Sequence, residues 1–137
     1  MSKICTSIEQ SKKLIELGID VNTADMSYHP IMDIDTMDFT KYLDIPSVIP
    51  FSEVKNSKVA MLPAWSLSAL LGLMPFHIIE NNRFGFYQVK GYNKQGETYR
   101  FGYKTNNDSF LFETSWHDDV VDAAFEMICW LKENNKI

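Results

Sequence analysis

Two clusters of acidic and histidine side chains have the residue types of a divalent-metal site. The first is the run His117-Asp118-Asp119, and the second is the segment Asp33–Asp38, which follows His29. Imidazole and carboxylate groups are metal ligands, so either cluster could serve a metal-dependent hydrolase. The EF-hand pattern is absent from the second cluster, for which a solvated acidic loop is the simpler account. Asp118 and Asp119 fit the start of a helix, where anions complement the helix dipole, so we expect no metal or other cofactor.

Nucleophilic side chains have no recognisable catalytic setting. Cys5 and Cys129 are the only cysteines and lie far apart in the chain, which argues against a disulfide framework and a structural zinc site. We expect both to be packed rather than reactive. The sequence also lacks the GxGxxG, GxxxxGK[ST] and GxSxG motifs of nucleotide-binding and hydrolase sites. These observations favour a protein that is not an enzyme.

The segment 83–104 combines aromatic and basic side chains, as do sheets that stack RNA bases. Its five cations against Glu97 give a local charge of +4, whereas the whole chain carries −5. The overall acidity and the absence of an RNP-like string argue against nucleic acid, but a local contact remains an alternative. The residues that would make it are Tyr87, Lys90, Lys94, Arg100 and Lys104. Trp116 and Trp130 are further binding candidates, because an exposed tryptophan commonly marks an interface.

The elements that would position these residues begin with an antiparallel meander. From Arg83 onward, apolar and polar residues alternate with a period of two, and turn residues at 93–96 and 106–108 divide the run into strands. Pairing across these turns predicts an aromatic face: Phe84, Phe86, Tyr99, Phe101, Tyr103, Phe110 and Phe112. The opposite, mixed face would carry Gly85, Tyr87, Val89, Gly91, Thr98, Arg100, Gly102, Lys104 and Glu113.

Three helices are predicted around this meander. The first follows a capping box at Thr6-Ser7-Ile8-Glu9 and ends before Gly18, and the second starts at Leu62-Pro63-Ala64-Trp65 and ends before Pro75. The third is capped near Ser115–Asp118 and has an apolar stripe from Val121 to Leu131. We therefore expect an α+β fold, in which a three- to four-stranded antiparallel meander has about three helices packed on its aromatic face.

Residues 19–62 are harder to interpret. Short extended segments are expected near residues 27–32 and 51–61, because a structureless loop of this length is uncommon in a compact domain. Residues 18–54 also hold seven acids against Lys41, an excess of charge for which the predicted elements give no reason.

A chain of 137 residues, 45% of them hydrophobic, predicts a single domain over 1–137. Its first residues lack the apolar core of a signal peptide, and the apolar stretch 67–79 is too short to cross a bilayer. We expect a cytoplasmic protein with no membrane contact.

Three segments together carry a resemblance to a known family. They are residues 4–19 with 23–26, residues 63–71 and residues 121–133, which cover both ends and the middle of the chain. In this order they resemble a family of short uncharacterised proteins of Bacteroidetes genomes, often associated with prophages and other mobile elements. The resemblance implies a bacterial or phage-related setting and transfers no functional residue.

Together these patterns predict a non-catalytic binding or interaction protein, such as a small accessory protein of a mobile element. Its partner would be another protein or a second copy of the chain. The nucleic-acid contact through 83–104 and the metal-dependent hydrolase are the alternatives.

Overall fold

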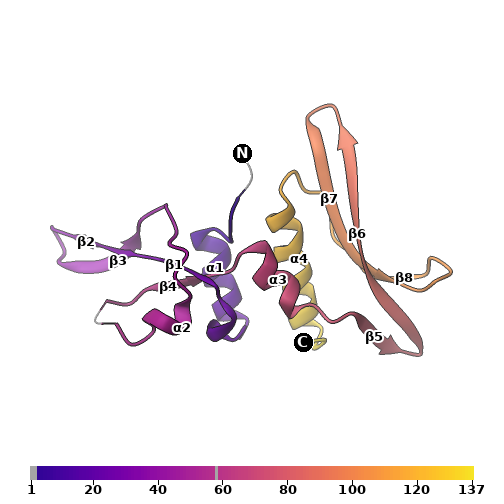
Figure 1. The fold of residues 1–137 in the computed structure, drawn as a ribbon, viewed down its shortest axis with the longest axis horizontal. Helices are drawn as coiled ribbons and strands as arrows, with labels where there is room; N and C mark the ends of the chain where they lie inside the picture. Colours follow the sequence, from indigo (N-terminus) through magenta and orange to yellow (C-terminus); the bar gives the residue numbers. More distant parts are fainter. Residues whose placement is uncertain (1–2, 58) are drawn as a thin grey trace. The chain divides into compact units, whose positions relative to one another are not determined.

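The computed structural model describes residues 3–57 and 59–137 and has a mixed α+β fold (Figure 1). In chain order the elements are α1 (Ile8–Glu16), the 3₁₀ helix η1 (Val21–Thr23), β1 (Met26–Tyr28), β2 (Pro30–Asp33), β3 (Asp38–Tyr42), α2 (Phe51–Val54), β4 (Leu62–Ala64), α3 (Leu67–Leu73), β5 (His77–Glu80), β6 (Asn82–Asn93), β7 (Gly96–Lys104), β8 (Phe110–Glu113) and α4 (Val120–Glu133). The predicted fold class is confirmed.

Contacts within the chain divide it into two compact units. Unit 1 contains Lys3 and residues 70–137, and unit 2 contains Ile4–Ala69. The single domain predicted over 1–137 stays a prediction.

Unit 1 is built on the predicted antiparallel meander, with strand order β5-β6-β7-β8. Phe86 pairs with Tyr103 and Gln88 with Phe101, which places the β6 and β7 aromatics on the expected face. The hairpin between these strands is tighter than predicted, since Asn93 pairs with Gly96 and only two residues form its turn. Gly96 has a φ of 124°, a conformation open to glycine but strained for other residues.

One residue of the predicted aromatic face lies on the other face. Between Tyr103 and Lys104 the register of β7 against β8 shifts, so that Phe112 pairs with Tyr103 but Phe110 pairs with Lys104. Because such an irregularity changes the alternation of side chains along the strand, Phe110 joins the mixed face. Its assignment to the aromatic face was therefore wrong.

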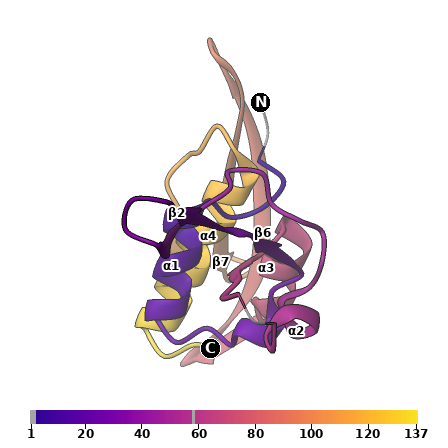
Figure 2. The ribbon, with the colours of Figure 1, turned by 90° about the vertical axis from the view of Figure 1, so that its left-hand side faces the viewer.

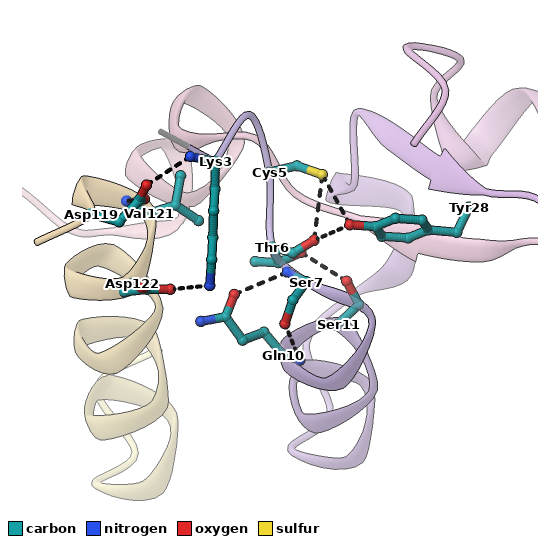
Figure 3. A network of polar contacts seen from close by, with 10 residues as sticks. All are labelled: Lys3, Cys5, Thr6, Ser7, Gln10, Ser11, Tyr28, Asp119, Val121 and Asp122. Atoms are coloured by element: carbon teal, nitrogen blue, oxygen red, sulfur yellow. Dashed lines mark hydrogen bonds and ion pairs between the residues drawn. The ribbon is translucent and has the colours of Figure 1, made fainter. Parts of the chain in front are cut away.

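Helix α4 packs on the aromatic face, against β7 (Figure 1). The ring of Trp130 stacks on that of Phe112, with centroids 4.5 Å apart and planes 9° from parallel. The helix begins later than predicted, because Asp119 rather than Ser115 is its N-cap and accepts a hydrogen bond from the Val121 amide. Lys3 also bonds here, through its backbone nitrogen to Asp119 and its ammonium to Asp122, at 2.7 and 2.6 Å (Figure 3).

Unit 2 shows two shifts from the predicted helices. The capping box of α1 is formed by Ser7 and Gln10, one residue beyond Thr6 and Glu9. Residues 62–64 form strand β4, paired with β1, so the second helix does not begin there. It begins instead at Leu67, after Ser66, whose hydroxyl accepts a hydrogen bond from the Ala69 amide.

The core of unit 2 lies between α1 and the β1–β4 pair. Its buried members are Cys5, Met26, Tyr28, Leu62 and Ala64, with Ile8 and Tyr42 packed against them. Strands β2 and β3 form a separate two-stranded hairpin. The hairpin extends away from α1, β1 and β4 of its own unit (Figure 1), and it points toward the viewer in Figure 2.

Two expectations for residues 19–62 have different outcomes. The extended segment near residues 27–32 is confirmed by β1 and β2, whereas the start of the segment 51–61 is the short helix α2. Within residues 3–57 and 59–137, no helix combines the length and apolar character needed to cross a membrane.

Candidate functional site

The mixed face of the unit 1 sheet brings together four of the seven predicted binding residues. The register places Tyr87 opposite Gly102, Val89 opposite Arg100, and Gly85 opposite Lys104, so these positions share one face of the sheet. Trp116, which follows β8, lies over the same face. Within unit 1, α4 occupies the opposite face, so the mixed face is the candidate site.

Two glycines in the strands allow aromatic rings to lie directly on the sheet. A Cβ atom at Gly91 would come within 2.9 Å of Trp116 Cζ3, and one at Gly102 would come within 2.5 Å of the Tyr87 hydroxyl. The rings therefore occupy the space that other side chains would fill, an arrangement that compensates for the missing side chain of a strand glycine. Gly91 and Gly102 thus fix where Trp116 and Tyr87 lie.

Arg100 is held between an aromatic ring and a carboxylate. Its guanidinium lies 4.6 Å from the centroid of the Trp116 ring, and Nη1 donates a hydrogen bond to Glu113 Oε2 at 2.9 Å. Both partners of this ion pair are about one-quarter exposed. A cation between a ring and a carboxylate has little rotational freedom, so Arg100 and Trp116 form a fixed pair.

Tyr87 occupies the centre of a second group of side chains. Lys104 Nζ lies 5.1 Å from the Tyr87 ring centroid, and the Phe110 ring lies beside it at 6.1 Å. Burial of the hydroxyl raises the pKa of Tyr87, and the Glu113 carboxylate raises it further. Tyr87 is therefore a neutral packing group at ordinary pH, not a base.

Part of this surface is open to solvent. Trp116 is 45% exposed and Phe110 is 52% exposed. A hollow of about 320 Å³ adjoins Trp116 and is lined by Gly91, Tyr92, Asn93, Thr98 and Trp116. The face thus combines two accessible rings with a shallow depression.

Arg100 and Lys104, the two cations beside the Trp116 and Tyr87 rings, each have a carboxylate partner. Arg100 pairs with Glu113, and Lys104 pairs with Asp108 at 2.8 Å. Both acids lie beyond residue 104, outside the segment 83–104 whose local charge is +4. Including them reduces the charge of the segment 83–113 to +2, which weakens the case for a phosphate-binding surface.

The other three predicted binding residues lie elsewhere in unit 1. Lys90 pairs with Tyr99, on the aromatic-face side of the sheet, and its ammonium lies 3.0 Å from Glu97. This contact with Glu97 raises the pKa of Lys90. Lys94 is in the two-residue turn, and Trp130 packs on Phe112 as described above. Phe110 was missed as a site residue because strict alternation assigned it to the other face.

The two candidate metal clusters contain groups that form turn, cap and ion-pair contacts. His117 Nε2 lies 2.7 Å from Glu126 Oε1, and Asp119 caps α4. Asp33 Oδ1 accepts a hydrogen bond from the Asp35 amide within the β2–β3 turn. Among the residues that the structure describes, no three His, Cys, Asp or Glu side chains are placed to hold a metal ion.

Cys5 belongs to a buried polar network of unit 2 rather than to a reactive site (Figure 3). Its sulfur lies 3.6 Å from the Tyr28 hydroxyl, which donates to the Thr6 carbonyl at 2.8 Å, while the Thr6 and Ser11 hydroxyls are 2.8 Å apart. Burial raises the pKa of the Cys5 thiol, so the nucleophilic thiolate is disfavoured. The prediction that Cys5 is buried is confirmed.

Comparisons with protein-family models, with curated proteins and with solved structures find no match to this chain.

Proposed function

We propose that the chain is a non-catalytic interaction protein that binds another protein through the mixed face of its β5–β8 sheet. The observation that carries the proposal is the half-exposed Trp116, seated on Gly91 and fixed by Arg100. Tryptophan, tyrosine and arginine are the residues that most often dominate the energy of protein interfaces. All three types meet here, together with the exposed ring of Phe110.

The charges of this face support a protein partner rather than a nucleic acid. The pairs Arg100–Glu113 and Lys104–Asp108 leave the face with cations and anions side by side. Nucleic-acid surfaces need cations that are free to replace counterions along phosphates. A surface of alternating charge suits a protein of complementary pattern, and it suits a second copy of the same face in a two-fold arrangement.

The proposed setting is the cytoplasm of a bacterium that carries a prophage or another mobile element. This part of the proposal rests only on the resemblance carried by residues 4–19 with 23–26, residues 63–71 and residues 121–133.

Two measurements test the proposal. Sedimentation velocity over a wide concentration range detects self-association, and capture of proteins from a bacterial lysate detects other partners. The informative variants are Trp116→Ala and Phe110→Ser, and Phe76→Ser is the matched control, because Phe76 is 85% exposed yet lies outside the mixed face. We expect the first two variants to weaken the association about tenfold or more and the control to leave it unchanged.

The proposal would be overturned if the protein is strictly monomeric and captures no protein whose binding is weakened by Trp116→Ala. A gel shift with single-stranded or duplex oligonucleotides that Arg100→Glu weakens would support the nucleic-acid alternative instead.

A further inference from the structure

The β2–β3 hairpin of unit 2 exposes an unusual amount of apolar surface. Ile34 is 82% exposed and Met37 is 67% exposed, both in the turn between the strands. Four more large apolar side chains along the hairpin and just after it are also exposed: Ile31, Met32, Phe39 and Leu43. A gathering of exposed apolar side chains on one short hairpin commonly marks an interaction site.

The hairpin cannot bury these side chains by itself. None of the residues of β2 and β3 is buried, and only Tyr42, at the end of β3, packs against the core of the unit. An isolated two-stranded ribbon is marginally stable in water and normally needs another layer on one face. The apolar residues therefore indicate a surface that a further chain covers.

The charge of the hairpin specifies the chemistry of that chain. Asp33, Asp35, Asp38 and Asp44 outnumber Lys41, and none of the four carboxylates forms an ion pair with a cation of residues 3–57 or 59–137. On the mixed face of unit 1, by contrast, Arg100 and Lys104 are both paired. The hairpin thus has unneutralised negative charge beside exposed apolar side chains.

A hollow on the hairpin combines the two properties. It has a volume of about 410 Å³, and its lining residues are Ile31, Met32, Asp33, Ile34, Asp35 and Lys41. The side chain of lysine or arginine has an apolar stem and a charged head, so it can pack on isoleucine while its head meets a carboxylate. The lining matches that type of side chain.

We propose that the β2–β3 hairpin is a docking surface for a basic, amphipathic segment of a partner protein. The partner's apolar side chains cover Ile34, Met37 and Phe39, and its lysine or arginine heads meet the aspartates. This surface shares no residue with the mixed face of unit 1, and the two proposals succeed or fail independently. The proposal also gives a reason for the acidity of residues 33–44.

Binding of synthetic peptides to the full-length chain tests this inference. The probe is a fluorescein-labelled peptide that alternates leucine and lysine, and the control peptide has glutamate at every lysine position. We expect the lysine peptide to bind, with an affinity that falls as salt is added, and the glutamate peptide to bind at least about tenfold more weakly.

Variants then locate the binding. Ile34→Ser should weaken it about tenfold, because it removes apolar area that the peptide would cover. The double variant Asp35→Asn with Asp44→Asn should weaken it about fivefold, by the loss of two surface charge contacts. The matched controls are Ile79→Ser, which alters an exposed isoleucine of unit 1, and Glu16→Gln, which removes an exposed acid of α1. Both controls should bind as the unaltered chain does.

Three results would overturn the inference. The first is failure of the lysine peptide to bind even at low salt. The second is equal affinity, either of the chain for the two peptides or of the hairpin variants and the control variants for the lysine peptide. The third is self-association that Ile34→Ser abolishes, since the occupant of the surface would then be a second copy of the chain.

Discussion

Replacing Gly91 with alanine tests the packing that seats Trp116 on the sheet. A Cβ at this position would lie 2.9 Å from Trp116 Cζ3 and 3.0 Å from Thr98 Oγ1, whereas ordinary contact begins at 3.4 Å. The indole ring must therefore move by about 0.5 Å, in a region where packing tolerates little adjustment. Its movement would also disturb the stacking with Arg100.

The expected loss of stability comes from two opposing contributions. Forcing an extra methyl group into a packed site costs about 1–3 kcal/mol. Glycine-to-alanine substitution reduces the entropy of the unfolded chain and returns about 0.4–1 kcal/mol. We therefore expect Gly91→Ala to lower the free energy of unfolding by about 1 kcal/mol.

Gly72→Ala is the matched control within the same unit. Gly72 lies in α3, and a Cβ there would meet nothing within 4 Å. Because alanine favours a helix over glycine, this variant should be more stable than the unaltered chain by about 0.5–1 kcal/mol. The same chemical change thus has opposite signs at the two positions.

Urea unfolding followed by circular dichroism and tryptophan fluorescence measures both effects. The midpoints of the two variants should differ by about 1 M urea. In a Trp116→Ala background the cost of Gly91→Ala should fall, since the ring that it displaces is gone. The reasoning is refuted if Gly91→Ala is as stable as the unaltered chain, or if its cost is the same with and without Trp116.

Other predictions concern single buried or charged groups. Thr114→Val should lower the free energy of unfolding by about 1–2 kcal/mol in the same urea experiment, because the buried Thr114 hydroxyl accepts a hydrogen bond from the Phe101 amide; an unchanged midpoint would contradict this. Cys5 should react with a thiol reagent at pH 8 at least about tenfold more slowly in the folded chain than in urea, and equal rates would show that the thiol is accessible. The hydrogen bond from Tyr99 is the largest cause that lowers the pKa of Glu97, so the stability it contributes is present above the ordinary glutamate pKa and is lost as pH falls through the lowered value. An NMR titration should show a higher Glu97 pKa in Tyr99→Phe, and an unaltered pKa would exclude this hydrogen bond.

The sheet was the most predictable part of the fold because its pattern is local. Alternation from Arg83 to Lys104, with Gly96 at the turn, determines which side chains share a face, and the register confirms this for Tyr87 and Arg100. The register shift after Tyr103 has no comparable sequence pattern, so Phe110 was assigned to the wrong face.

Helix boundaries were harder, because competing caps lie next to one another. Thr6 and Ser7 can both cap α1, and the outcome depends on a distant contact, since the Thr6 hydroxyl accepts a hydrogen bond from the Trp65 amide. Pro63 suggested the first turn of a helix, but the pairing of β4 with β1 makes its segment a strand. Long-range pairing of this kind overrides local preference.

The candidate site was partly predictable for a related reason. Tyr87, Arg100, Lys104 and Trp116 were recognised from their residue types. The ion pairs that Arg100 and Lys104 form were not predicted. Asp108 and Glu113 lie beyond the segment 83–104. The predicted pairing placed Glu113 on the mixed face, but the ion pairs themselves depend on the fold of β8 and its turn. For the same reason, the basic character of 83–104 overstated the positive charge of the folded surface.

The bonds from Lys3 to α4 have a consequence for the order in which the chain folds during synthesis. Residues 4–69 are contiguous, so the ribosome delivers all of unit 2 before most of unit 1 exists. Lys3 and Asp119 are 116 residues apart, and their hydrogen bond can form only after Asp119, the N-cap of α4, has emerged. Closing so long a loop costs conformational entropy and slows formation of the contact. Lys3 must therefore wait until residues 119–122 have been synthesised before it binds its partners in unit 1.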